Sequence, residues 1–292
     1  MDFIDNLKRT FKTGNMVIKL IYVNAGVFLL ISAFSLIMQL FKLNHIEFTR
    51  WFAVPSNLQQ LLTHVWTLVT YMFYHERFFH VFFNLLVLFW FGKIFLMYYS
   101  EKQLLSLYIF GGLLGAIFYI IAYNLFPYYE AAVYYSLLMG ASGSILAILT
   151  ASAVKAPNME VQLLLIGRIK LKWIAIVTVL ISFFGLTSGN AGGELAHLGG
   201  ALAGYLFVVG ERNGRDITSF INGVIDFFVN LFRSRPKVKK TTYHAPKMSS
   251  EEYNQKKAAD EKAIDKILDK IKTSGYESLS ADEKRKLFEQ KR

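Results

Sequence analysis

Six apolar segments constrain the fold of this chain more than any other feature of its sequence. The hydrocarbon core of a bilayer is about 30 Å thick, and a helix of about 20 apolar residues crosses it. The segments cover residues 17–41, 80–98, 104–125, 140–154, 173–186 and 194–209. The fourth and fifth are short and edged by small or polar residues, which is tolerable where neighbouring helices shield them from lipid. The sequence therefore predicts an all-α, polytopic bundle of six transmembrane helices.

The composition is typical of a membrane protein, and it argues against nucleic-acid binding and cysteine chemistry. The chain is 54% hydrophobic with a mean hydropathy of +0.35, whereas soluble domains are nearer 45–50% apolar. The net charge of +11 would suggest nucleic-acid binding in a soluble protein. Here the cations flank apolar segments or follow residue 210, so membrane topology explains them and no nucleic-acid partner is expected. The absence of cysteine excludes disulfides, thiolate metal sites and cysteine nucleophiles.

Lysine and arginine placement predicts the orientation, because these residues concentrate on the cytoplasmic side of membrane proteins. They cluster in residues 8–19, 93–102, 155–172 and 212–215, and they are absent from the loops at 126–139 and 187–193. Both termini are therefore expected in the cytoplasm. The N-terminus resembles neither a signal peptide nor a transit peptide. The first apolar segment is thus expected to persist as a spanning helix, and a prokaryotic cytoplasmic membrane is the expected location.

Four parts follow from this organisation. We expect a cytosolic segment at 1–16, a membrane domain at 17–210, an amphipathic interfacial helix with a basic linker at 211–240, and a cytosolic helical tail at 241–292. Apolar residues at helical spacing over 216–232, followed by the basic run 233–240, are typical of a helix lying in the membrane interface. In the tail, Ser280 and Glu283 form an S-x-x-E capping box that predicts a final helix.

Polar side chains inside three of the apolar segments are the candidates for function. Such residues are costly in a membrane, so their presence indicates a functional site. Each lies in the first turns of a segment that enters from the outer side. With a helical rise of about 1.5 Å per residue, all lie at a similar depth, which favours one shared site. They are His80 and Asn84 in the second segment, Ser142 and Ser144 in the fourth, and Glu194 and His197 in the sixth.

Ser142 is the candidate nucleophile. It lies between Gly140 and Gly143, where the absence of side chains allows other backbone to approach closely. The unpaired N–H groups at the start of a helix suit a developing oxyanion. Small-residue runs also serve plain helix packing, and that alternative stays open for the motif by itself.

His197 is the candidate base. Ala196, Gly200 and Gly204 recur every four residues and form a smooth face for a partner helix beside the histidine. A histidine at the depth of Ser142 favours a nucleophile–base pair, although a proton relay or a satisfied polar contact is the alternative. Glu194 is the nearest carboxylate but lies at the loop edge, so a Ser–His dyad is the more economical hypothesis.

His80 and Asn84 are spaced i, i+4 and project from one helix face. Both can donate hydrogen bonds, which makes them candidates for oxyanion stabilisation, with helix-to-helix hydrogen bonding as the alternative. Residues 75–80 look like the zinc-protease motif H-E-x-x-H but contain one residue too many. A five-residue step rotates about 140° around a helix, so His75 and His80 would not share a face, and no metal is expected.

At these residues the chain resembles the rhomboid family of intramembrane serine proteases. The resemblance rests on H-x-x-x-N at 80–84, G-x-S-G at 140–143 and A-H-x-x-G-x-x-x-G at 196–204, and it covers roughly residues 17–210. It implies a six-helix bundle with Ser142 as nucleophile and His197 as general base and acid. It further implies that His80, Asn84 and the Ser142 backbone N–H hold the oxyanion. It implies single-span membrane proteins as substrates, without metal or cofactor.

Two other function classes remain as alternatives. A catalytically silent rhomboid-like protein would bind and escort membrane clients, but such relatives typically lack the serine or histidine that this chain retains. A transporter or proton channel would need polar residues along a whole pathway, whereas the inner halves of these segments are nearly free of them.

Overall fold

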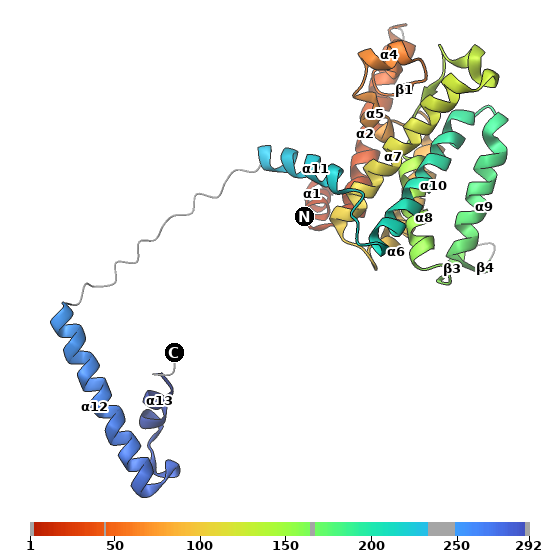
Figure 1. Ribbon diagram of the computed structural model, residues 1–292. Helices are drawn as coiled ribbons and strands as arrows, with labels where there is room; N and C mark the ends of the chain where they lie inside the picture. The colour runs from red at the N-terminus through yellow and green to blue at the C-terminus, as the bar shows by residue number, and fades with distance from the viewer. Residues whose placement is uncertain (1–2, 44, 164–166, 233–248, 290–292) are drawn as a thin grey trace. The chain divides into compact units, whose positions relative to one another are not determined.

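Residues 3–43, 45–163, 167–232 and 249–289 are described by the computed structural model (Figure 1). The chain divides into two compact units, residues 1–233 and 234–292. The predicted basic run 233–240 lies outside the described residues. The first unit is a helical bundle and contains every candidate site residue.

All six apolar segments are helices in this bundle. They are α2 (Met16–Leu40), α6 (Phe78–Phe95), α7 (Glu101–Leu125), α8 (Ser142–Lys155), α9 (Leu171–Phe184) and α10 (Ala191–Arg212). Among the described residues, α2, α6, α7 and α10 are long and apolar enough to cross a membrane, while α8 and α9 are shorter apolar helices.

The short helix α8 lies at the centre of the bundle. It contacts α6, α7, α9 and α10, and every residue from 143 to 153 is buried. Gly200 on α10 lies so close to α8 that a Cβ there would overlap the Gly143 carbonyl oxygen, and Gly204 faces the Ala147 carbonyl oxygen in the same way. Close backbone contact through small residues is the usual means by which membrane helices pack, and here it holds the helix that carries Ser142.

We expect Gly200→Ala to destabilise the bundle by roughly 3 kcal/mol, because the added methyl meets backbone atoms that cannot move aside as a side chain would. Gly26→Ala on α2 is the matched control, since nothing lies within 4 Å of a Cβ at that position. Thermal unfolding in detergent micelles measures both variants. Equal unfolding midpoints for the two would contradict the close α8–α10 contact.

The bundle also carries elements that the helical segments do not predict. These are α3 (His45–Arg50), β1 (Val54–Pro55), α4 (Leu58–Thr63), α5 (Thr67–Thr70), η1 (Tyr71–Phe73), η2 (Pro127–Ala132), β2 (Leu137–Leu138) and η3 (Gly185–Thr187), of which β1 and α4 lie at one end of the bundle (Figure 1). Strands β1 and β2 are antiparallel, with Val54 opposite Leu138, and we call this the β1–β2 end. The opposite end carries the antiparallel pair β3 (Glu160–Leu163) and β4 (Gly167–Lys170). The expectation of purely helical structure therefore misses two short strand pairs, because strands of two to four residues leave no detectable periodicity.

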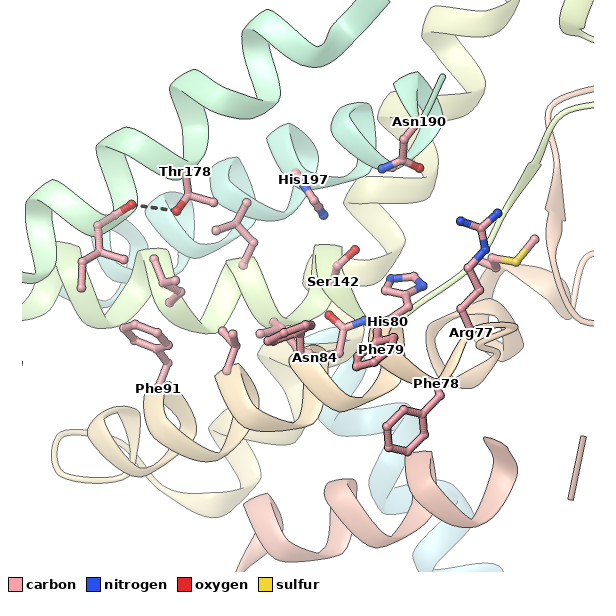
Figure 2. A pocket seen from close by; sticks show the side chains of 18 residues that line it. Arg77, Phe78, Phe79, His80, Asn84, Phe91, Ser142, Thr178, Asn190 and His197 are labelled. Atoms are coloured by element: carbon pink, nitrogen blue, oxygen red, sulfur yellow. Dashed lines mark hydrogen bonds between the residues drawn. The ribbon is translucent and has the colours of Figure 1, made fainter. Parts of the chain in front are cut away.

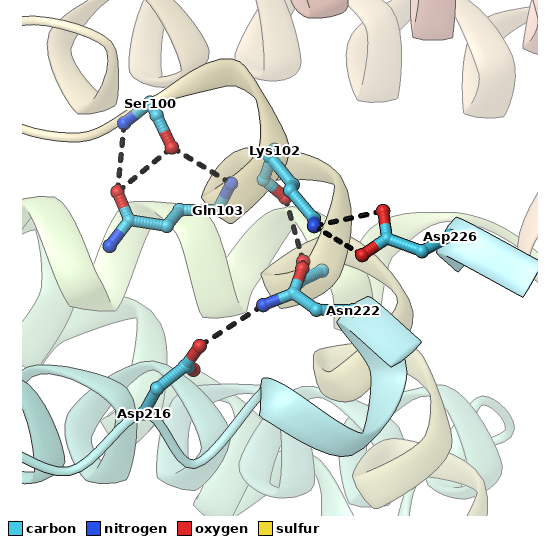
Figure 3. Close-up of polar contacts among 7 residues, drawn as sticks. Ser100, Lys102, Gln103, Asp216, Asn222 and Asp226 are labelled. Atoms are coloured by element: carbon cyan, nitrogen blue, oxygen red, sulfur yellow. Dashed lines mark hydrogen bonds and ion pairs between the residues drawn. The ribbon is translucent and has the colours of Figure 1, made fainter. Parts of the chain in front are cut away.

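Two amphipathic helices flank the bundle, α1 (Phe3–Thr13) and α11 (Ser219–Phe232). Polar contacts join α11 to the start of α7, which begins with a capping box between Ser100 and Gln103 (Figure 3). Lys102 forms an ion pair with Asp226 at 2.8 Å, and the Ser106 hydroxyl contacts the Asn222 side chain. On α11, Phe220, Phe227 and Leu231 remain exposed.

The second unit contains α12 (Ser250–Ser274), η4 (Tyr276–Ser278) and α13 (Ala281–Glu289). Lys270 on α12 forms an ion pair with Glu283 on α13. The structure confirms the predicted capping box: the Glu283 carboxylate accepts from the Ser280 N–H at 2.7 Å, and the Ser280 hydroxyl accepts from the Glu283 N–H. These contacts hold the pKa of Glu283 down at about 2.

Candidate functional site

A cavity of about 780 Å³ lies among helices α6, α8, α9 and α10 (Figure 2). Four of the residues predicted for the site line it together: Ser142, His197, His80 and Asn84. Ser144 does not line it. That residue is 1% exposed, and its hydroxyl has no hydrogen-bond partner among the described residues.

Three contacts hold the backbone of residues 137–141, which leads into Ser142. Strand β2 pairs with β1, the Gly140 N–H donates to the Tyr71 carbonyl at 2.9 Å, and the Ala141 N–H donates to His75 Nε2 at 3.2 Å. Gly140 has φ +112°, and a Cβ there would lie 2.7 Å from the His80 ring. Glycine is therefore required at this position both for its backbone conformation and for the space.

Helix α8 begins at Ser142 without a side-chain cap. Because the first N–H groups of a helix have no partner within the helix, the donors of its first turn remain available to a ligand. Ser142 is the first residue of this turn and lines the cavity. The site thus combines a hydroxyl with unpaired backbone donors.

His75 holds residues of this site in place, although the sequence pattern predicts no role for it. Its side chain is fully buried and lies just before α6. Nδ1 lies 3.3 Å from the Phe73 carbonyl oxygen, and Nε2 lies 3.2 Å from both the Ala141 nitrogen and Asn84 Nδ2. This network assigns the proton of the neutral ring to Nδ1. Nε2 therefore accepts hydrogen bonds from the Ala141 N–H and from the Asn84 side chain. Burial lowers the pKa of His75 to about 4, and the neighbouring His80 adds to the shift.

His197 faces Ser142 from α10. Its Nδ1 lies 3.0 Å from the Ser182 hydroxyl on α9 and 3.2 Å from Glu194 Oε2 on its own helix. Figure 2 shows the ring pointing across the cavity toward the Ser142 hydroxyl. Among the described residues no hydrogen bond joins the two side chains, so the Nε2 edge of the ring is unengaged.

His80 and Asn84 occupy the α6 wall beside Ser142 (Figure 2). The His80 ring makes no hydrogen bond within the described part of the chain. Asn84 is 8% exposed and directs its amide group to His75, which leaves a second N–H for another acceptor. A second cavity of about 530 Å³ adjoins the first. The two share Arg77, His80 and Asn190, and Glu76 also lines the second.

Metal ligation finds no support in the described residues, where no three histidine or carboxylate side chains come close enough together to hold an ion. His75 and His80 are neighbours, with ring centroids 5.2 Å apart, but they come from a loop and a helix and His75 Nε2 is already engaged. The zinc-like spacing of residues 75–80 therefore has a different structural meaning: one ring supports the backbone before Ser142, and the other lines the cavity.

Comparison with known families identifies the membrane unit. The Rhomboid domain model matches residues 62–212, which is 151 of the 292 residues. The chain belongs to the rhomboid family. The rhomboid domain is typical of intramembrane serine proteases, and the matched range contains every residue of the cavity described above. Residues 250–290 match a second family, DUF6576, whose function is unknown. No curated protein matches this rhomboid-family chain.

Proposed function

We propose that this rhomboid-family protein is an intramembrane serine protease with Ser142 as nucleophile and His197 as general base. The observation that carries the proposal is that the two side chains, from separate helices, line one cavity (Figure 2). The unengaged Nε2 edge of His197 faces the hydroxyl. A nucleophile beside a base that is itself held by further groups is the arrangement that activates serine.

The chemistry follows from the donors and acceptors present. Ser142 Oγ attacks the carbonyl carbon of the scissile bond while its proton passes to His197 Nε2. The oxyanion accepts hydrogen bonds from the Ser142 N–H, His80 and Asn84. When the intermediate collapses, His197 gives its proton to the leaving amine. Water then hydrolyses the acyl-enzyme by the same steps in reverse, and neither metal nor cofactor takes part.

The cavity wall suits a substrate that arrives from the bilayer. Apolar side chains continue from Ser142 along α6 and α9, among them Phe79, Phe83 and Ile174. A segment of a single-span membrane protein can occupy this wall once its helix unwinds near the cut. We therefore propose peptide bonds in or next to transmembrane segments as the substrate class.

The proposed topology has six spans and both termini in the cytoplasm of a prokaryotic cell. It places the β1–β2 end at the outer surface, because the cations cluster at the other end of the segments. The exposed apolar residues of α11 then lie against the inner leaflet, and the tail lies in the cytosol.

A serine-reactive phosphonate or isocoumarin probe tests the proposed function on the detergent-solubilised full chain. We expect covalent labelling at Ser142, located by mass spectrometry of the tryptic peptides, and no labelling of Ser142→Ala. An intact, folded protein that the probe fails to label would favour the alternative, a silent rhomboid-like protein that escorts membrane clients.

A further inference from the structure

We propose that Glu194 is a positioning residue that holds His197 in the tautomer able to take the proton of Ser142. The inference rests on the proposed function and extends its Ser–His pair by a third group. The sequence places Glu194 at a loop edge. In the structure α10 already begins at Ala191, so Glu194 lies within its first turn, three residues before His197.

The contacts show that a place is built for this carboxylate. Glu194 Oε2 lies 3.2 Å from His197 Nδ1, and the Glu194 side chain is only 15% exposed. The polar side chains of Ser182 and Asn190 also lie beside the carboxylate. Gly185 makes room for it, since a Cβ there would lie 2.9 Å from Glu194 Cγ. A mostly buried carboxylate that is bonded to His197 and lies among polar side chains differs from a solvated surface charge.

Hydrogen-bond roles explain why the carboxylate decides the tautomer. A hydroxyl can donate or accept, so Ser182 alone is compatible with either tautomer of His197. An ionised carboxylate only accepts, and Nδ1 must therefore carry the proton that faces Glu194. The lone pair is then left on Nε2, on the side of Ser142. The same negative charge stabilises the imidazolium that forms when His197 takes the proton.

The position of Glu194 indicates that it orients His197 and does not contact the substrate. It contacts the Nδ1 side of the imidazole ring and does not line the cavity that contains Ser142. Its effect on the reaction must therefore pass through His197. For this reason we expect a change in turnover without a change in substrate binding.

Glu194→Gln tests the proposal in the full chain reconstituted in liposomes with a single-span substrate. The amide keeps the size of the side chain but can donate to Nδ1, which favours the wrong tautomer. We expect kcat to fall about 100-fold with KM unchanged, less than the about 10⁴-fold of an isolated triad carboxamide change, because Ser182 remains. The rate of probe labelling at Ser142 should fall by the same factor. Glu194→Asp, which keeps an acceptor-only group, should restore part of the rate.

Two further measurements exclude a structural explanation. The thermal midpoint of Glu194→Gln should match that of the wild type, and the nitrogen-15 shifts of the His197 ring should change from the Nδ1–H form to a mixture. Glu130→Gln, on an exposed carboxylate of η2 outside both cavities, is the matched control and should change nothing. Wild-type kcat in Glu194→Gln, or a loss only in proportion to unfolded protein, would overturn the proposal. Either result leaves the protease function intact, whereas turnover by Ser142→Ala would overturn that function itself.

Discussion

Ser142→Ala is expected to abolish cleavage of a single-span substrate, with a loss of at least roughly a thousandfold. Removal of the hydroxyl takes away the proposed nucleophile. The other hydroxyl that lines the cavity, on Thr178, donates to the Ile174 carbonyl oxygen of its own helix. The Ser142 hydroxyl makes no hydrogen bond within the described residues, so its loss should cost little stability. Cleavage in liposomes, followed by mass spectrometry of the products, measures turnover, and thermal unfolding in detergent verifies the fold.

Ser144→Ala provides the matched control on the same helix. Its hydroxyl is buried beside α7 and has no partner in the described part of the chain. Replacement of a buried, unsatisfied hydroxyl by hydrogen removes a desolvation cost, so we expect normal cleavage and an equal or slightly higher unfolding midpoint. Loss of cleavage in both variants would instead favour the packing interpretation of the small-residue run, and retention in both would remove Ser142 as the nucleophile.

The helices of the bundle could be predicted because long apolar runs allow few other structures. Differences occur at their ends. The third segment is predicted over 104–125, but α7 begins at Glu101 because Ser100 and Gln103 form a capping box in residues that hydropathy disregards. The fourth is predicted from residue 140, but α8 begins at Ser142. The preceding backbone is held by Tyr71 and His75, which are tertiary contacts that local sequence does not contain.

The reactive pair could be predicted because polar residues at matched depth in apolar segments are conspicuous. The residues that support this pair could not be predicted in the same way. Ser182 looks like an ordinary polar residue of the fifth segment, and its contact with His197 depends on how α9 packs against α10. The sixth apolar segment begins at residue 194, which predicts a loop edge for Glu194. Helix α10 begins three residues earlier, at Ala191, and its first turn carries Glu194 to His197.

His75 escaped prediction for a related reason. No spacing rule connects a loop residue to the N–H of Ala141, 66 residues later in the chain. The apparent zinc motif depends on the spacing between His75 and His80. The structural role of His75 depends instead on the burial of its ring and on the lone pair of Nε2.

His75→Ala is expected to have the second-largest effect, because it removes the acceptor that fixes the backbone before Ser142. The variant leaves the Ala141 N–H and the Asn84 amide unpaired in a buried site, at a cost of about 1–3 kcal/mol each, and adds a void. A small shift of the nucleophile can lower the rate by about 100-fold. We expect both a lower unfolding midpoint and a loss of cleavage in the fraction that stays folded. His64→Gln is the matched control for cleavage. His64 follows the last residue of α4, and its ring contacts Gln60, Thr63 and two tryptophan rings instead of the backbone before Ser142, so cleavage should be unchanged.

Burial of the His75 ring, with a smaller effect of His80, lowers the pKa of His75 and makes the stability of the fold sensitive to acid. Above about pH 6.5 the His75 ring is neutral in folded and unfolded chains and contributes no pH dependence. Below that pH the unfolded chain binds a proton that the folded chain excludes until its own pKa of about 4. Stability is therefore lost as the pH falls through this window, by roughly 3 kcal/mol in total. His75→Gln keeps an oxygen that can accept from Ala141 but cannot titrate, so its unfolding midpoint should fall less than that of the wild type between about pH 7 and about pH 4.5. Carboxylates titrate in both proteins and cancel in this comparison. Parallel curves for the two proteins would contradict the lowered pKa of His75 in the folded chain.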